Sequence, residues 1–251
     1  MGSSVKFFAG LHHPGDAQNL HRCMISVNAL MDRKGDIAPA GEWILDSGAF
    51  SQIAKNGRFS LSIRDYATAI IRWSKCGNMV AAVSQDYMCE PFVIAKTGLT
   101  VAEHQRLSIG NYCSIAGLVG SAAYVMPVLQ GFWPEEYVSH VRQYGRLLGR
   151  GQLVGVGSVC KRNADMGAIE RVLVAIRNER PDLLLHGFGV KLTALKSSIV
   201  RDCLHSADSM AWSFAARYEG RDGNDWHEAE AFAKRIENQP VRQRDFQPVM
   251  F

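Results

Sequence analysis

The feature that most constrains the fold of this chain is a regular alternation between short apolar runs and longer amphipathic stretches. Eight runs have the length and composition of buried strands, and they cover residues 5–10, 22–30, 42–50, 78–86, 123–131, 152–159, 182–190 and 207–213. The second of these is also compatible with a short helix. Because parallel strands need crossover connections, which helices usually supply, the alternation predicts a parallel sheet covered by helices.

The stretches between these runs have the periodicity of surface helices. In the stretch 60–77, Ile63, Tyr66 and Ile70 recur at helical spacing. Pro134 suits the first turn of a helix over residues 134–148. Further helices are expected over residues 101–117, 165–180, 193–205 and 225–238. Seven or eight strand–helix units in 251 residues favour a closed (β/α)₈ barrel of the TIM type over an open doubly wound sheet.

The composition is that of one globular unit. A hydrophobic fraction of 47% and a charged fraction of 21% are ordinary for such a domain, and no linker separates two halves. We therefore expect a single domain over residues 1–251, in which residues 238–251 form an irregular tail. No apolar run approaches the roughly 20 residues of a membrane span, and the N-terminus lacks the pattern of a signal peptide. We accordingly expect a cytoplasmic protein.

Cysteine spacing and net charge narrow the chemistry only a little. The six cysteines are scattered, and no Cys-x-x-Cys or His-Glu-x-x-His pattern occurs, so we expect reduced thiols, no metal site and no cofactor. A net charge of +4 permits binding to nucleic acid without requiring it.

Three carboxylates and one amide stand where the predicted strands end. Asp46, Asp86 and Asp208 each belong to such a strand end, and Gln130 belongs to another. In a TIM barrel, reactive groups gather at the carboxyl ends of the strands and in the loops beyond them. Each aspartate taken alone is equally compatible with a cap for the following helix. Three of them on one predicted rim favour a shared site.

Six short motifs at these strand ends resemble a known family. They are LDSGAFSQ (45–52), VSQDYMCEP (83–91), PVLQG (127–131), GVGSVCKR (155–162), HGFGVK (186–191) and ADSMAW (207–212). In this order they resemble the tRNA-guanine transglycosylase superfamily, and most closely its short branch, the 7-deazapurine DNA-modification transglycosylases (deazapurine DNA modification protein A type), a type compatible with a phage gene. The resemblance implies a TIM-type barrel that exchanges guanine in nucleic acid for a 7-deazaguanine such as 7-cyano-7-deazaguanine (preQ0) or a derivative.

The resemblance also implies catalytic roles for two aspartates. Asp208 would attack C1′ of the sugar and form a covalent glycosyl–enzyme intermediate, which divides one difficult displacement into two. Asp46 would carry protons to the leaving guanine and from the incoming base, a task that suits a carboxyl group with a shifted pKa. A structural turn held by Ser47 and Gly48 is the alternative reading of Asp46.

The remaining motifs imply a pocket for the base. Asp86 would accept two hydrogen bonds from the N1–H and the exocyclic amine of guanine. Gln130 would donate its amide to O6, with the Gly157 backbone N–H as a second donor and Ser158 beside it. Gln130 is alternatively a buried amide that the backbone satisfies. Tyr87 or Met88 would stack on the base, and a core role is the alternative for either.

Contacts to phosphate are the least defined expectation. Lys161, Arg162 and Arg217 are candidates, together with His13 in the loop after the first strand, and a solvated surface is the alternative for each. His12 and Arg221 are weaker candidates of the same kind. A target base is inaccessible inside a duplex, so the base must be flipped out or presented in a single strand, with a helper protein that opens the duplex as one route.

Departures from the family pattern bear on the polymer that is modified. The zinc-binding relatives that act on tRNA carry a cysteine cluster after the nucleophile, and no cysteine follows Cys203 here. This absence and the short tail favour DNA over tRNA, although Trp212 and Ser213 depart from the usual nucleophile segment. From another class, Lys191 would form a Schiff base in an aldolase-like or lyase barrel. A third alternative is an inactive barrel that only binds nucleic acid or a partner.

Overall fold

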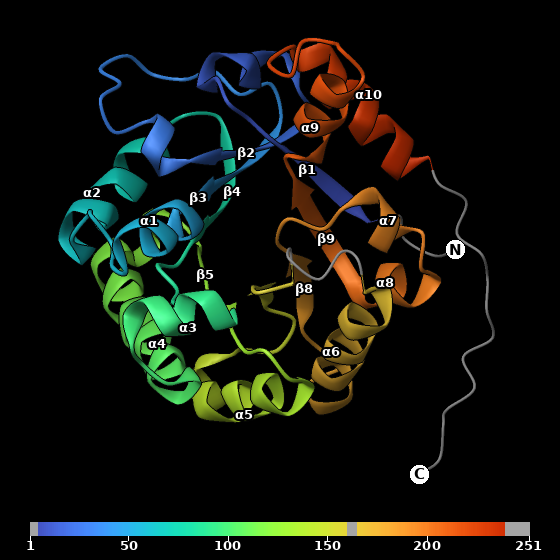
Figure 1. Cartoon of the computed structure of the whole chain (residues 1–251). Helices are drawn as coiled ribbons and strands as arrows, with labels where there is room; N and C mark the ends of the chain where they lie inside the picture. The colour runs from blue at the N-terminus through green and yellow to red at the C-terminus, as the bar shows by residue number, and fades with distance from the viewer. Residues whose placement is uncertain (1–4, 160–164, 239–251) are drawn as a thin grey trace.

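The strands of the chain form a barrel with the helices outside it. The computed structural model describes residues 5–159 and 165–238, and Figure 1 shows the ring of helices around the strands. The strands, all parallel to their neighbours, are β1 (Lys6–Gly10), β2 (Arg22–Ser26), β3 (Glu42–Asp46), β4 (Asn78–Val83), β5 (Val125–Met126), β6 (Val128–Leu129), β7 (Leu153–Val156), β8 (Leu184–Gly187) and β9 (Leu204–Ser209). The predicted TIM-type barrel is confirmed.

The two edges of the sheet are joined at Pro127. The strand order is β5-β4-β3-β2-β1-β9-β8-β7-β6, so β5 and β6 stand at opposite ends of it although only Pro127 separates them in the chain. Towards β4, Ser84 donates its N–H to the Met126 carbonyl at 3.0 Å. Towards β7, Gly155 donates to the Pro127 carbonyl at 2.9 Å. Residues 125–129 therefore act as one strand that pairs on both sides and closes the barrel.

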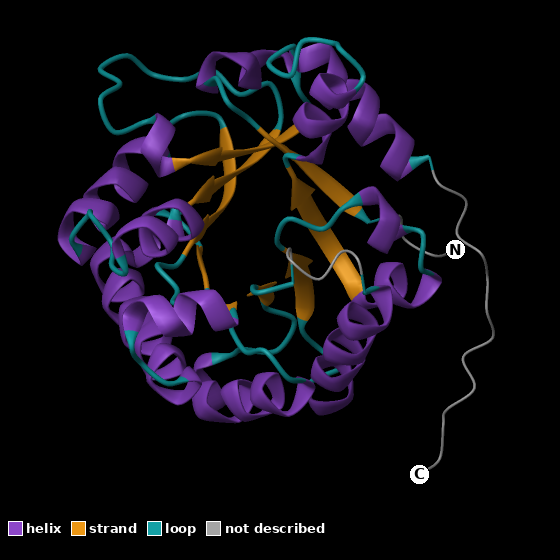
Figure 2. Cartoon of the chain, viewed as in Figure 1, coloured by secondary structure: helices purple, strands orange, loops and turns teal. Residues whose placement is uncertain are grey.

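The helices follow the strands around the outside, as Figure 2 shows in purple. The α-helices are α1 (Ala49–Asn56), α2 (Ile63–Trp73), α3 (Pro91–Thr97), α4 (Val101–Val119), α5 (Pro134–Tyr144), α6 (Met166–Glu179), α7 (Leu192–Leu195), α8 (Ser198–Cys203), α9 (Ala211–Tyr218) and α10 (Trp226–Glu237). Short 3₁₀ segments are η1 (Pro14–Asn19), η2 (Val27–Ala29), η3 (Gly120–Ala122) and η4 (Gly145–Leu147). None of the described helices is long and apolar enough to span a bilayer.

Local sequence explains where the longer helices begin. The Ser62 hydroxyl accepts from the Asp65 N–H and caps α2. At α4, Thr100 and Glu103 form a reciprocal capping box, which satisfies two of the N–H groups that a helix start leaves open. Pro134 begins α5, where its missing N–H costs nothing. These starts position the loops that carry the site.

Alternation along the strands separates two hydrophobic cores. In β1, the Phe8 side chain joins Met24 and Ile44 in one buried cluster, which the neighbouring strands share inside the barrel. Phe7 in β1 and Trp43 in β3 belong instead to the larger cluster between the strands and the helices. The Phe7 ring lies 5.6 Å from that of Phe232 in α10. Successive residues of a strand thus face opposite sides of the sheet.

Several predicted boundaries differ from the structure by a few residues, and the three clearest errors lie beside β3 and β9. The predicted strand 42–50 ends at Asp46, because Gly48 has a φ of +72° that turns the chain into α1. The predicted helix 193–205 is interrupted after Leu195 and gives way to β9 at Leu204. The predicted strand 207–213 stops at Ser209, and α9 follows it. Helix α3 was not predicted, and the tail beyond residue 238 lies outside the described residues.

Candidate active site

A cavity of about 650 Å³ lies at the carboxyl ends of the strands. Such a volume is in the usual range for small-molecule sites. Its lining includes the carboxylates predicted for the site, Asp46, Asp86 and Asp208, and also Gln130. The structure therefore brings together four side chains that are up to 162 residues apart in the chain, counted from 46 to 208.

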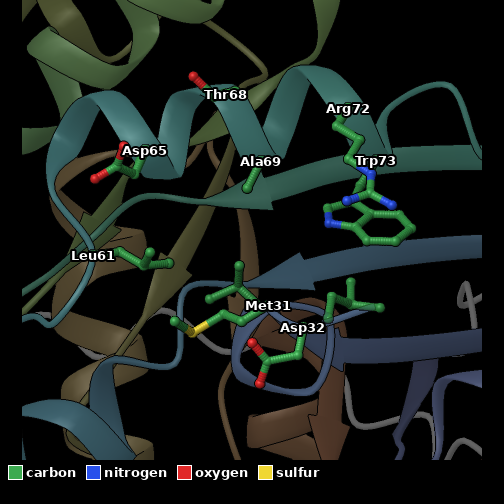
Figure 3. A pocket seen from close by; sticks show the side chains of 10 residues that line it. Met31, Asp32, Leu61, Asp65, Thr68, Ala69, Arg72 and Trp73 are labelled. Atoms are coloured by element: carbon green, nitrogen blue, oxygen red, sulfur yellow. The ribbon is translucent and has the colours of Figure 1, made fainter. Parts of the chain in front are cut away.

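A second cavity is different in place and lining. It has a volume of about 260 Å³ and lies between α2 and the segment that follows β2 (Figure 3). Trp73, Arg72 and Asp65 contribute to it from α2, and Met31 faces them from the other segment. Arg72 donates to the Arg33 carbonyl at 2.9 Å, and this bond holds the loop after η2 against α2. None of the rim carboxylates lines this second cavity.

Asp46 is held by the turn that follows β3. Its Oδ2 accepts from the Gly48 N–H at 3.0 Å. A side chain at Gly48 would collide with Asn28, so the turn needs glycine for space as well as for its positive φ. The amide of Gln52 donates to Asn28 at 2.7 Å and locks the start of α1 against η2. The turn fixes the Asp46 carboxyl group at the cavity wall.

The contacts that orient the Asp208 carboxylate all involve one of its two oxygens. Its Oδ1 accepts from the Gly189 N–H at 3.1 Å and lies 3.3 Å from Nε2 of His186. His186 is fully buried in β8, and its Nδ1 lies 2.8 Å from the Ser206 hydroxyl. If Ser206 donates to Nδ1, then Nε2 carries the proton and donates to Asp208. His186 thus orients the Asp208 carboxylate, whose side chain remains 14% exposed.

Asp46 and Asp208, hereafter the carboxylate pair, lie close enough for the charge of Asp208 to act on Asp46. Burial and, to a smaller extent, the negative charge of Asp208 raise the pKa of Asp46, hydrogen bonds from Gly48, Ser26 and Ser47 lower it, and the net result is a pKa of about 6. A carboxyl group with a pKa near 6 can give and take a proton close to neutral pH. The pair therefore combines an oriented carboxylate with a proton carrier.

Asp86, Gln130, Ser158 and Glu90, hereafter the buried network, form a hydrogen-bonded chain on another wall of the cavity. All four are at most 5% exposed. Gln130 Nε2 donates to Asp86 Oδ2. The Ser158 hydroxyl lies 2.7 Å from both Gln130 Oε1 and Glu90 Oε2. Polar groups that are this deeply buried persist because they satisfy one another.

Hydrogen bonds from neighbouring side chains also fix the backbone at Gln130. The Gln130 N–H donates to Nδ1 of His140 at 2.9 Å, and its carbonyl accepts from Gln105 at 2.7 Å. Burial lowers the pKa of His140 to about 4, so this imidazole is neutral and accepts the bond. The main chain of Gln130 is therefore fixed before any ligand arrives, and its side chain is the part that can turn.

Burial also dominates the electrostatics of Asp86. It raises the pKa of this carboxyl to about 7; the hydrogen bond from Gln130 lowers it, and the charges of Asp46 and Glu90 raise it. Protonated and ionised forms of Asp86 consequently coexist near neutral pH. A ligand that donates hydrogen bonds to this carboxylate would favour the ionised form.

Two residues assigned to the base have other contacts in this structure. The Gly157 N–H donates to the Leu129 carbonyl at 3.0 Å in the barrel ladder, so its role as a second donor to O6 stays a prediction. Gly157 matters for space, because a side chain there would collide with Gln130. The Tyr87 ring lies against Phe59 and His104 rather than in the cavity lining. Met88 lines the cavity and is the better candidate for contact with a base.

The candidate phosphate contacts that the structure describes, Arg217 and His13, are not part of the cavity lining. Arg217 is exposed on α9, and its guanidinium lies 3.3 Å from Nε2 of His12. His13 is exposed at the start of η1. Lys161 and Arg162 lie outside the described residues. Phe214, on α9 beside Arg217, lines the cavity although it is 73% exposed, so it stands at the mouth.

Sequence reasoning missed two residues of the site. His186 appeared in the sequence only as the first residue of the motif HGFGVK, and its bond to Asp208 needs β8 and β9 to be neighbours. Glu90 precedes Pro91 and has the sequence of an ordinary helix start, although its side chain makes no cap. Within residues 5–159 and 165–238, no group of three His, Cys, Asp or Glu residues could hold a metal ion.

Comparisons with known proteins agree with this arrangement. No curated protein matches the chain. The sequence model of the DpdA family, described as DeoxyPurine in DNA protein A, matches residues 5–231. That range contains the whole described barrel up to α10 and every member of the carboxylate pair and the buried network. The chain therefore belongs to the DpdA (DeoxyPurine in DNA protein A) family, a membership that implies a transglycosylase-type enzyme of 7-deazaguanine DNA modification with DNA as its substrate.

Proposed function

We propose that the enzyme replaces guanine in DNA by a 7-deazaguanine, either 7-cyano-7-deazaguanine (preQ0) or a derivative, through a covalent intermediate on Asp208. The observation that carries the proposal is the meeting of the carboxylate pair and the buried network in one cavity. One wall offers a nucleophile and a proton carrier, and another offers hydrogen-bonding groups for a flat polar base. Exchange of a base needs both.

The carboxylate pair supports a double displacement. An Asp208 oxygen attacks C1′ and the C1′–N9 bond breaks, so that its electron pair passes to guanine while Asp46 supplies a proton to that base. The incoming base then gives its N9 proton to Asp46, and N9 attacks C1′ and expels Asp208. Two inversions retain the sugar configuration. Since His186 and Gly189 both hold Oδ1, we assign the attack to Oδ2.

The buried network supports recognition of guanine. The ionised Asp86 carboxylate accepts from N1–H and the exocyclic amine, a donor pair that the other DNA bases lack. Gln130 donates to O6, for which its amide must turn away from Asp86 when the base arrives. A site built from buried polar groups rejects a base that leaves those groups unpaired. Adenine and the pyrimidines are therefore excluded.

The mouth of the cavity suits a nucleotide taken out of a stack. The cavity can hold a base but not a duplex, so the target base is flipped out or single-stranded, and a helper protein that opens the duplex remains an expectation. Phe214 offers an aromatic face to a neighbouring base, and Arg217 with His13 offers charge or hydrogen bonds to phosphate. Lys161 and Arg162 stay sequence predictions for the same task.

The test is incorporation of a labelled base. The protein is incubated with a labelled 7-deazaguanine and either single-stranded DNA, duplex DNA or tRNA, and the nucleosides are then separated by mass spectrometry. Label in deoxynucleosides and release of guanine are expected. Label in tRNA alone would overturn the choice of DNA. A covalent DNA–protein adduct that survives denaturation, absent in Asp208→Asn, would identify the intermediate.

The Schiff-base alternative has less support. Lys191 lines the cavity but its side chain is exposed. An amine that forms a Schiff base is ordinarily activated in a desolvated pocket or beside another cation. Borohydride in the presence of a carbonyl substrate would trap such an adduct on Lys191, whereas the glycosyl-aspartate chemistry gives no borohydride-dependent adduct.

A further inference from the structure

One face of helix α9 carries two aromatic rings that are exposed to solvent. Phe214 and Tyr218 are 73% and 94% exposed, the two highest values among the large apolar side chains that the structure describes. On the opposite face, Trp212 is buried and donates its Nε1–H to the Gly10 carbonyl at 2.8 Å. The inner face of α9 therefore belongs to the barrel, and the outer face presents two rings.

Helical spacing places a positive charge beside these rings. Side chains three and four positions apart share one face of a helix, so Phe214, Arg217 and Tyr218 form one exposed row, hereafter the α9 row. Phe214 also lines the cavity, so the row begins at the cavity mouth and continues one helical turn away from it. Aromatic rings with a neighbouring cation form the kind of surface that binds single-stranded nucleic acid, by stacking on bases and by pairing with phosphate.

Arg217 is held in place although it is exposed. Its guanidinium lies 3.3 Å from Nε2 of His12, which is also 2.9 Å from the Ser213 hydroxyl. Burial and, to a smaller extent, the charge of Arg217 lower the pKa of His12, so this imidazole is neutral and accepts. A side chain at Gly223 would collide with that of Arg217, so the loop after α9 packs against the arginine stem. These contacts orient the charge of Arg217 without neutralising it.

The other arginine of this region is engaged within the protein. Arg221 forms ion pairs with Glu219 and Glu228, which use its charge and theirs. The Asp222 carboxylate accepts a backbone N–H of its own turn at 2.8 Å. The charge that this helix offers to a phosphate is therefore that of Arg217.

The spacing of the two rings selects the form of the nucleic acid. Four residues at about 1.5 Å each separate Phe214 from Tyr218 by about 6 Å along the helix axis. Neighbouring bases of a duplex are only about 3.4 Å apart along its axis, and they cover the faces of one another. Two separate rings can each meet a base only where the strand is unstacked. The row therefore suits the nucleotides beside one that has been flipped out.

We propose that the α9 row binds the single strand on one side of the target nucleotide, with Phe214 and Tyr218 stacked on two successive bases and Arg217 paired with the phosphate between them. That this strand is the one that carries the target rests on the proposed function. Stacking needs only the flat face of a base, so the row accepts any sequence. It holds one side of the opened strand and thereby presents the target nucleotide to Asp208.

The first measurement is binding of a fluorescent oligothymidine, which contains no guanine, to the full-length protein. Phe214→Ala and Tyr218→Ala should each raise Kd by about three- to tenfold, because each removes one stacked base. Tyr218→Phe keeps the ring and should bind like wild type. Tyr218→Leu keeps an apolar side chain without a ring and should bind as weakly as Tyr218→Ala. Leu118→Ala, an exposed apolar position on α4, is the control and should leave Kd unchanged.

Photochemical cross-linking then locates the strand. The photoreactive base 5-iododeoxyuridine is placed one, two or three nucleotides to either side of a target deoxyguanosine, and the cross-linked peptides are identified by mass spectrometry. Cross-links to Phe214 and Tyr218 are expected from two successive positions on the same side of the target. Cross-links confined to other elements, or equal Kd values for wild type and both alanine variants, would overturn the proposal.

Oligothymidine also separates this inference from the proposed function, because its binding needs no base exchange. If wild type exchanges guanine in DNA but binds oligothymidine equally well without the α9 rings, only the α9 row is wrong. If the row binds and cross-links as expected but no base is exchanged, the proposed function fails and the row remains a site for single-stranded DNA.

Discussion

The two walls of the cavity differ in how completely their polar groups are satisfied. In the buried network, every side chain is at most 5% exposed, and each hydrogen-bonds to another member. In the carboxylate pair, both side chains are partly exposed, and the bonds to Asp208 converge on one of its oxygens. One wall has its polar groups paired with one another before the ligand arrives, and the other keeps one oxygen of Asp208 for chemistry.

This difference is what recognition and bond-breaking each require. A group that discriminates between bases gains from a fixed geometry, since the wrong base then leaves buried groups unpaired. A nucleophile gains from orientation without full satisfaction, because every bond to the attacking oxygen must be given up in the transition state. Substitutions on the carboxylate-pair wall should therefore lower kcat, and substitutions in the buried network should act through kcat/KM and base choice.

The largest effect is expected for Asp208→Asn. The amide keeps the shape of the carboxylate but is not a nucleophile, so kcat should fall by about 10⁴-fold or more. Single-turnover exchange of labelled guanine measures this loss. The matched control is Asp65→Asn, at the second cavity beside α2, which should exchange at the wild-type rate. Near-normal exchange by Asp208→Asn would rule out its role as nucleophile.

Asp86→Asn should have the next largest effect. The substitution replaces an acceptor oxygen by a donor that opposes the N1–H or amine of guanine, so kcat/KM should fall by about 10²- to 10³-fold. Competition between guanine and other purines in the free-base exchange should become less selective. If selectivity stays intact while only kcat falls, the division between the two walls is wrong.

His186→Ala should lower kcat by about 10- to 100-fold and leave the KM for DNA nearly unchanged, because His186 orients Asp208 without touching the base. His186→Gln keeps a donor of similar reach and should recover part of the loss. A merely structural role predicts instead that both variants lose thermal stability and activity together, which unfolding curves would reveal.

The pH dependence of kcat/KM should reflect one titrating group from each wall of the cavity. Asp86 must be ionised to accept from guanine, and its pKa of about 7 makes kcat/KM fall as the pH drops below that value. Asp46 must be protonated to assist the leaving base, and its pKa of about 6 makes kcat/KM fall as the pH rises above that value. A bell with its maximum between pH 6 and 7 follows. In Asp86→Asn, the acid limb should disappear.

The smallest effect is expected outside both walls. Arg217→Ala should weaken binding of single-stranded DNA by about two- to fivefold and reduce the salt slope by about one, with base choice unchanged. Fluorescence titration at several salt concentrations measures it. Arg142→Ala is the control, an exposed arginine on α5 that pairs with Glu179. Equal effects of the two substitutions would show that Arg217 has no specific role in DNA binding.

Much of the carboxylate pair could be predicted from the sequence. Asp46 stands at the end of an apolar run and Asp208 lies in the motif ADSMAW, and the closure of parallel strands into a barrel brings strand ends to one rim. The strand ends themselves were less predictable. Apolar residues return directly after Gly48 and after Ser209, so hydrophobicity alone does not separate each strand from the helix that follows; the backbone conformations at Gly48 and Met210 mark the helix starts.

The buried network could be predicted only in part. Asp86 and Gln130 are visible as strand-end polar residues, and Ser158 follows from the motif that contains it. Glu90 is not visible, because a glutamate before a proline has the ordinary sequence of a helix start. Likewise, the sequence cannot show that the Gly157 N–H belongs to the barrel ladder, since that depends on the pairing of β7 with β6.

The barrel closes at Pro127, next to the residues proposed to recognise the base. Asp86 follows β4, Gln130 follows β6 and Ser158 follows β7, so the buried network crosses the place where the two edges of the sheet meet. Residues 125–129 pair with β4 on one side and with β7 on the other. In a folding intermediate that lacks one of these pairings, the three side chains are not yet brought together. Such an intermediate could hold a nucleophile in place yet have no means of choosing a base. On the proposed function, completion of the ring is thus the step that assembles the groups for base recognition.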